Sequence, residues 1–129
     1  MLGGPVEEPE APRAEIQNSP YLYYIDPKSG KLCKYQIHLD TTNIGRKKDN
    51  DLELVSKYIS RYQARIDLAI GEDGSQNLVM RDLESSGGFR VNGDKRTEHK
   101  LVKGDQIKIG KTVLIFIGKP PHRSFLRLK

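Results

Sequence analysis

The sequence contains a single cysteine, Cys33, among its 129 residues. No internal disulfide and no site built from several thiolates can therefore form, which favours a reducing compartment over secretion. No apolar stretch approaches the roughly 18 residues that a membrane-spanning helix needs, and the segment Met1–Glu8 lacks the basic and apolar regions of a signal peptide. We therefore expect a soluble nuclear or cytoplasmic protein with no membrane partner.

Signatures of catalytic and cofactor sites are missing as well. Gly110–Thr112 has the letters that end a phosphate-binding P-loop, but Asp105 stands where that motif requires a glycine, and a strand pattern follows where it requires a helix. The three histidines, His38, His99 and His122, show no metal-ligand spacing. The sequence thus predicts a protein that is not an enzyme and that holds no cofactor or metal.

Acidic residues are concentrated at the start of the chain. Residues 1–20 contain four glutamates and one arginine, a local charge of −3. Since the whole chain has a net charge of +5, residues 21–129 carry +8. A basic domain favours acidic partners such as phosphopeptides, acidic protein segments or nucleic acid. The same charge is also compatible with ordinary solubilising lysines on the surface.

The chain length fits one domain with flanking segments. Residues 1–19 hold prolines and glutamates with almost nothing apolar to bury, so this segment cannot offset its ordering entropy, and we expect a disordered leader. We assign the folded domain to residues 20–118 and a basic tail to residues 119–129.

Short runs of alternating or β-branched residues, separated by turn residues, predict strands throughout the domain. They cover Tyr21–Ile25, Leu32–Leu39, Ala64–Ile70, Asn77–Met80, Gln106–Ile109 and Val113–Ile117. Residues 71–75 and the dipeptide Asn92-Gly93 are expected to be tight turns. Because Val113–Ile117 is apolar throughout, we expect it to be a well-buried strand. No segment shows a sustained helical period, which indicates an antiparallel β-sandwich.

Three further segments are predicted to be loops between strands: Thr42–Lys48, Ile59–Ile66 and Asp82–Gly93. They contain guanidinium groups, hydroxyl groups and glycines, which let a ligand backbone approach closely. Arginine forks and hydroxyl donors are suited to bind a phosphate dianion. The residues concerned are Arg46, Ser60, Arg61 and Ser86.

In their order and spacing these segments resemble the forkhead-associated (FHA) family. Gly45-Arg46 matches the family's Gly-Arg, and Ser60–Ile66 matches its Ser-x-x-His block with the strand that follows. Asp82–Gly93 aligns without gaps on Asp-Leu-x-Ser-x-Asn-Gly-Thr-Phe-Val-Asn-Gly. The family's later pattern is met by Leu101, Gly104-Asp105 and Ile107–Gly110. The resemblance covers residues 20–118.

The resemblance implies an all-β, eleven-stranded antiparallel sandwich of FHA type, whose loops at one end bind a phosphothreonine-containing protein segment in extended form. By position, Arg46 would contact the phosphate and the ligand backbone, and Ser60 would donate its hydroxyl to the phosphate. Arg61 would add a second cationic contact, and Ser86 would complete the site. Docking of this kind depends on charge and positioning more than on buried area.

Three positions depart from the family pattern. Gln63 stands in place of a histidine that braces the loops, and glutamine can also donate and accept hydrogen bonds there. Gly87 stands in place of an asparagine that bonds the ligand main chain, so one anchoring contact should be missing. Phe89-Arg90 replaces Thr-Phe, and either side chain could read the residues after the phosphothreonine.

The predicted set of ligand contacts contains six residues: Arg46, Ser60, Arg61, Ser86, Gly87 and Arg90. The set expected to support the loops contains five: Gly45, Gln63, Gly88, Asn92 and Gly93. Two alternatives stay open at this point. One is a scaffolding or dimerising FHA-like domain that ignores phosphate, and the other is electrostatic binding to nucleic acid, which no aromatic-interleaved basic run supports. The sequence leaves the oligomeric state and the identity of the partner open.

Overall fold

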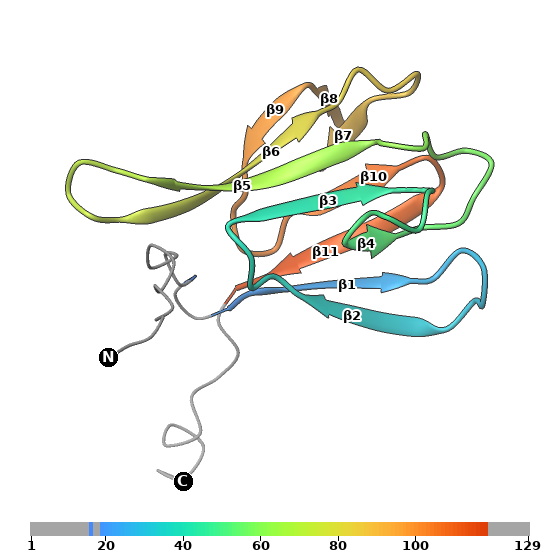
Figure 1. Cartoon of the computed structure of the whole chain (residues 1–129), viewed down its shortest axis with the longest axis horizontal. Coiled ribbons are helices and arrows are strands. Elements are labelled where there is room, and N and C mark those ends of the chain that lie inside the picture. The colour runs from blue at the N-terminus through green and yellow to red at the C-terminus, as the bar shows by residue number, and fades with distance from the viewer. Residues whose placement is uncertain (1–15, 17–18, 119–129) are drawn as a thin grey trace, which may run out of the picture.

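The computed structural model describes residue 16 and residues 19–118, and this part of the chain contains eleven strands and no helix (Figure 1). The strands are β1 (Tyr21–Ile25), β2 (Leu32–Gln36), β3 (Thr41–Gly45), β4 (Leu52–Glu53), β5 (Ala64–Ile70), β6 (Gln76–Asp82), β7 (Phe89–Val91), β8 (Asp94–Arg96), β9 (Glu98–Lys100), β10 (Gln106–Ile109) and β11 (Thr112–Ile117). The all-β class and the strand number that the sequence predicts are confirmed.

The strands form two sheets. The six-stranded sheet has the order β2-β1-β11-β10-β7-β8, and the five-stranded sheet has the order β4-β3-β5-β6-β9. Neighbouring strands are antiparallel except for β3 and β4, which pair in parallel through Ile44 and Leu52. The sandwich is therefore antiparallel with one parallel pair.

The core lies between the two sheets, because every second side chain of a strand points inward. In β10, for example, Ile107 and Ile109 are buried while Gln106 and Lys108 are exposed. Phe89 of β7 is the largest of the fully buried side chains. Residues of both sheets line the core, among them Leu22, Leu114, Ile44, Ile66 and Met80.

Strand register brings three connections to one end of the sandwich. Ala64, the first residue of β5, pairs with Ile44 near the end of β3 and with Asp82 at the end of β6. The β3–β4, β4–β5 and β6–β7 connections therefore lie at the same end of the strands of the five-stranded sheet, as Figure 1 shows. The three segments that the sequence singles out are thus neighbours in space.

Asn92-Gly93 forms the turn between β7 and β8, as predicted. Both residues have positive φ angles, 51° and 94°, which is the conformation of a type I′ hairpin turn. The Asn92 side chain also ties this turn to β10, since its Oδ1 accepts a hydrogen bond from Gln106 N at 2.9 Å.

Several sequence-based expectations need correction. Val113–Ile117 is not a well-buried strand, because Val113 is 41% exposed and Ile115 and Ile117 are half-buried. These side chains lie on the outer face of the six-stranded sheet, while Leu114 and Phe116 point into the core. The run Leu32–Leu39 is strand only as far as Gln36.

The three predicted loops also contain strand residues. Residues 42–45 belong to β3, residues 64–66 begin β5, and Phe89–Val91 is β7. Ile16, inside the predicted leader, is 8% exposed and packs with the core. The rest of the predicted leader, apart from Ser19, and the tail at residues 119–129 lie outside the described residues.

Candidate functional site

Gly45 and Arg46 come at the end of β3, against the backbone of the β4–β5 loop. Arg46 N donates to Ser60 O at 3.0 Å, and the Arg46 side chain donates from Nε to Ile59 O at 2.9 Å. A Cβ at position 45 would lie 2.2 Å from Arg61 O, so only glycine permits this approach. Nε is held by the Ile59 carbonyl, whereas no hydrogen bond of the described residues engages the two outer nitrogens of Arg46, so they remain available to a ligand.

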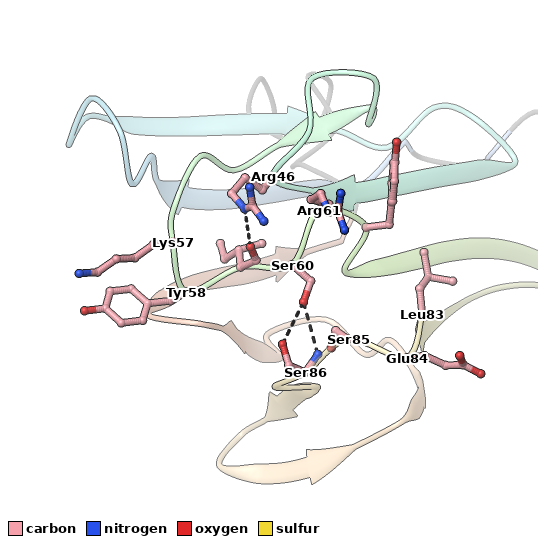
Figure 2. A pocket seen from close by; sticks show the side chains of 11 residues that line it. Arg46, Lys57, Tyr58, Ser60, Arg61, Leu83, Glu84, Ser85 and Ser86 are labelled. Atoms are coloured by element: carbon pink, nitrogen blue, oxygen red, sulfur yellow. Dashed lines mark hydrogen bonds between the residues drawn. The ribbon is translucent and has the colours of Figure 1, made fainter.

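Ser60 and Ser86 meet across two loops. Their Oγ atoms lie 3.5 Å apart, and Ser86 N donates to Ser60 Oγ at 3.4 Å (Figure 2). Both contacts are long, so an anion that accepts from these hydroxyls would compete with weak interactions only. In this view Arg46 and Arg61 lie on one side of Ser60, and Ser86 lies on the other.

Gln63 is 2% exposed and connects the two loops. Its Oε1 accepts from Ser60 N at 2.8 Å, and its Nε2 donates to Ser85 Oγ and to Gly88 O, each at 2.8 Å. Buried polar groups are stable when such bonds are satisfied, and they are costly when they are not. Gln63, which the resemblance aligns with a bracing histidine, therefore carries hydrogen bonds that brace both loops.

Ser85 is a residue of this network that sequence reasoning missed. Its hydroxyl donates to Asp82 Oδ1, and it accepts from Gly88 N at 2.8 Å as well as from Gln63. Ser85 N in turn donates to Asp82 Oδ2 at 3.1 Å. This folds the start of the β6–β7 connection into a compact turn. The Asp-x-x-Ser spacing is the signal that could have indicated it.

An open cleft of about 580 Å³ joins these groups. It is lined by Arg46, Lys57, Tyr58, Ile59, Ser60, Arg61, Tyr62, Leu83, Glu84, Ser85 and Ser86. Three of these side chains are cations and one, Glu84, is a carboxylate, so the cleft favours an anion. Figure 2 shows Glu84 pointing away from Ser60.

The remaining predicted residues are placed differently. Gly87 and Arg90 line a neighbouring cavity rather than the cleft itself. Gly88, with a φ of +67°, receives the Gln63 bond and turns the chain into β7. Asn92 and Gly93 make the β7–β8 turn and support β10. The structure therefore brings Arg46, Ser60, Arg61 and Ser86 together and places the other two predicted contacts, Gly87 and Arg90, in the adjoining cavity.

Tyr58 and Tyr62 are cleft residues that the sequence did not indicate. Tyr62 Oη donates to Asp49 Oδ2 at 2.9 Å, and this hydrogen bond raises the pKa of the Tyr62 hydroxyl. Tyr58 is 50% exposed, and Lys111 Nζ lies 4.3 Å from its ring centroid. Their positions on either side of Ser60-Arg61 in the sequence could have indicated that both tyrosines line the cleft.

Neither a metal centre nor a membrane span is visible in the described residues. No group of three or more His, Cys, Asp or Glu side chains in this part of the chain could hold a metal ion. A helix long and apolar enough to cross a bilayer is also absent from it.

The sequence matches the family model of the FHA domain over residues 42–110. The chain belongs to the FHA family. The predicted resemblance is therefore confirmed, and FHA domains are interaction modules. The matched region includes all three loops of the cleft.

Several characterised proteins are similar to this FHA domain. The oxoglutarate dehydrogenase inhibitor of Corynebacterium diphtheriae is 33% identical over 94 residues, which is 73% of this chain and 61% of the inhibitor. A structure of Mycobacterium tuberculosis EmbR in complex with a low-affinity phosphopeptide is 35% identical, with a TM-score of 0.60, over 79% of this chain and 26% of EmbR. The chain thus spans under two thirds of these relatives' lengths.

A second similar structure comes from a structural and functional analysis of phosphothreonine-dependent FHA domain interactions. It is 27% identical, with a TM-score of 0.64, and the match covers 79% of this chain and 99% of that one. Together with the family match, these likenesses confirm the FHA-type sandwich.

Proposed function

We propose that this FHA domain binds protein segments that contain phosphothreonine, and that the cleft between the β3–β4, β4–β5 and β6–β7 connections receives the phosphate. Arg46 and Arg61 supply charge, and the hydroxyls of Ser60 and Ser86 supply short-range donors. The partner is then a phosphorylated protein segment in extended conformation.

One observation carries this proposal: four potential phosphate donors from three connections line one cleft, and hydrogen bonds of the backbone and of Gln63 hold them there. Ser60 shows this most directly. Its N–H is bound by Gln63 and its carbonyl by Arg46 N, so its hydroxyl is presented from a fixed backbone. A site arranged before the ligand arrives loses less entropy on binding.

The relatives support the same ligand class. EmbR is similar to this chain and has been seen with a phosphopeptide, and another similar FHA domain takes part in phosphothreonine-dependent interactions. We further propose that the domain acts as a docking module without catalysis of its own. Of the two locations that composition predicts, the bacterial source of the curated relatives favours the cytoplasm.

Binding of a peptide series by fluorescence anisotropy at fixed ionic strength tests the proposal. A phosphothreonine peptide should bind, while its unphosphorylated form should bind at least about tenfold more weakly, since it lacks the charge-assisted hydrogen bonds of the phosphate. Arg46→Ala should weaken binding by about tenfold to a hundredfold, since a charge-assisted hydrogen bond is worth about 1.5–3 kcal/mol. Arg96→Ala, which removes an arginine of β8 outside the cleft, is the matched control.

A second candidate function rests on a different feature. The outer face of the six-stranded sheet exposes Ile25, Leu32 and Val113, which are 53%, 70% and 41% exposed. An apolar patch of this kind is typical of contact surfaces that do not depend on phosphate. If wild type and Arg46→Ala bind a partner equally, with or without phosphate, this second function replaces the first.

A further inference from the structure

The cavity beside the phosphate cleft is lined by Tyr58, Gln63, Gly87, Gly88, Phe89, Arg90, Lys108 and Gly110, and it measures about 230 Å³. Tyr58 lines both hollows, and Gly87 follows Ser86 directly in the chain. A peptide that places its phosphate between Ser60 and Ser86 can therefore continue past Tyr58 into this second cavity.

A row of three cations borders this cavity. Arg90 of β7 pairs directly with Lys108 of β10 on one side and with Lys95 of β8 on the other. Directly opposed residues of antiparallel strands project from the same face, so the three charged side chains are neighbours. Lys95 reaches toward the cavity as well, because its Cε lies 3.2 Å from the position of a Cβ at Gly88.

None of these cations is neutralised by the domain itself. Within the part of the chain that the structure describes, the ion pairs involve other residues, and no carboxylate lines the cavity. The Arg90 guanidinium donates only a long hydrogen bond, to Gly93 O at 3.3 Å. Like charges placed directly opposite one another destabilise a sheet, so this row lowers the stability of the free domain.

The cations also lie on one side of the phosphate cleft. Lys111 and Lys57 extend the positive charge around the Tyr58 ring, at 4.3 Å and 5.4 Å from its centroid. Glu84, the carboxylate among the cleft residues, lies on the opposite side of Ser60 from Tyr58 in Figure 2. Beyond the four proposed phosphate contacts, the Tyr58 flank therefore carries cations, whereas the opposite flank carries the Glu84 carboxylate.

We infer that the row Lys95–Arg90–Lys108 is a second anion subsite, which binds an acidic or phosphorylated side chain on one flank of the phosphothreonine. This inference rests on the proposed phosphothreonine function. It adds that the domain selects segments with a second negative charge near the phosphothreonine. The bound anion removes the repulsion within the row, so selectivity comes from charge that the free domain leaves uncompensated.

The test uses phosphothreonine peptides of otherwise neutral sequence, in which a single aspartate or phosphoserine is moved through each of five positions on either side. For the wild-type domain we expect tighter binding by about threefold to tenfold, at one or two positions on one side only, because exposed ion pairs are individually weak. Phosphoserine should give a larger gain than aspartate, because its phosphate carries more negative charge and more acceptor oxygens.

The double variant Lys95→Gln with Lys108→Gln should lose this gain and keep its affinity for the neutral phosphothreonine peptide. Lys100→Gln, an exposed lysine of β9 in the other sheet, is the matched control and should keep the gain. In low salt the double variant should also melt at a higher temperature than the wild type, since the repulsion is relieved.

Three results would overturn the subsite. One is equal affinity for neutral and acidic peptides, and another is a gain that persists in the double variant. The third is a gain that follows total peptide charge at every position, which indicates unspecific attraction of any polyanion, nucleic acid included. Failure of the neutral phosphothreonine peptide to bind the wild type refutes the proposed function itself and, with it, the subsite.

Discussion

Gln63 Oε1 accepts a hydrogen bond from the backbone N–H of Ser60 at 2.8 Å. The same side chain donates to Ser85 Oγ and Gly88 O, so one buried amide connects the loop of Ser60 with the loop of Ser86. The spacing of the two hydroxyls in the cleft therefore depends on a residue that is itself not among the residues lining the cleft.

Replacing Gln63 by alanine should destabilise the domain by about 2–3 kcal/mol, because it leaves buried donors and acceptors of both loops unsatisfied. Urea unfolding followed by circular dichroism measures this loss. Gln36→Ala, an exposed glutamine of β2, should change stability by less than about 0.5 kcal/mol. Equal stabilities of the two variants would show that the hydrogen bonds of Gln63 do not support the loops.

Gly87→Asn should strengthen binding of a phosphothreonine peptide by about threefold to tenfold, since it restores a side chain that can bond the ligand main chain. No atom lies within 4 Å of a Cβ at position 87, so the substitution fits without strain. Gly74→Asn, in the β5–β6 turn remote from the cleft, is the control for binding: its φ of +85° strains a side chain there, but affinity for the peptide should not change. Unchanged affinity of Gly87→Asn would mean that the ligand backbone does not pass this residue.

Gly45→Ala should destabilise the domain by about 3 kcal/mol, at the upper end of the range for overpacking. The added methyl group would lie 2.2 Å from Arg61 O and 2.8 Å from Asn50 Nδ2, so the β3 end and the β4–β5 loop must separate. Thermal unfolding checks the effect, and peptide binding should fall with it because Arg46 moves. A variant as stable as the wild type would show that these backbones can part at little cost.

Asp105 connects the two sheets and makes the stability of the domain depend on pH. Burial raises the pKa of its carboxyl group, but hydrogen bonds from Val102 N, His99 and Asn92 outweigh burial, so the pKa lies below the usual 3.8. A carboxyl group with a lowered folded-state pKa stabilises the fold fully above its unfolded-state pKa of about 3.9. That stabilisation is lost as the pH falls through the folded-state value.

The Asp105→Asn variant should therefore be about 1–3 kcal/mol less stable than the wild type at pH 7, and the difference should shrink below pH 4. Urea unfolding at a series of pH values between 2.5 and 7 measures both quantities. Asp94→Asn changes a carboxylate whose side chain is 75% exposed, and its difference from the wild type should stay small at every pH. A constant difference for Asp105→Asn would contradict the assigned pKa direction.

Many of the strands and turns could be predicted from the sequence, since alternation and turn chemistry are local properties. Ala64–Ile70 and Gln106–Ile109 have the predicted bounds, and Asn92-Gly93 makes the predicted turn. Val113–Ile117 was predicted wrongly to be buried because an apolar run does not reveal whether a second layer covers its outer face. The small strands β4, β8 and β9 were not located individually, because two or three residues carry too little pattern.

The sequence indicated only in part which side chains lie together. Arg46, Ser60, Arg61 and Ser86 line one cleft, which their places in the three family motifs suggested. Arg90 and Gly87 lie in the next cavity instead, and the row Lys95–Arg90–Lys108 was invisible because its members are paired only across strands. Register between β7, β8 and β10 is a long-range property that no local pattern specifies.

The sequence by itself determined the family and the all-β class and supplied the groups that we propose bind phosphate, because motifs, alternation and side-chain chemistry are local features of the chain. Only the tertiary structure decided which of these groups share a cleft, that Gln63 and Ser85 hold two loops together, and that three cations face one another across strands. The physical reason is that hydrogen bonds and electrostatic repulsion depend on the distance between groups in space, not along the chain. Strand pairing brings together residues that are distant in sequence.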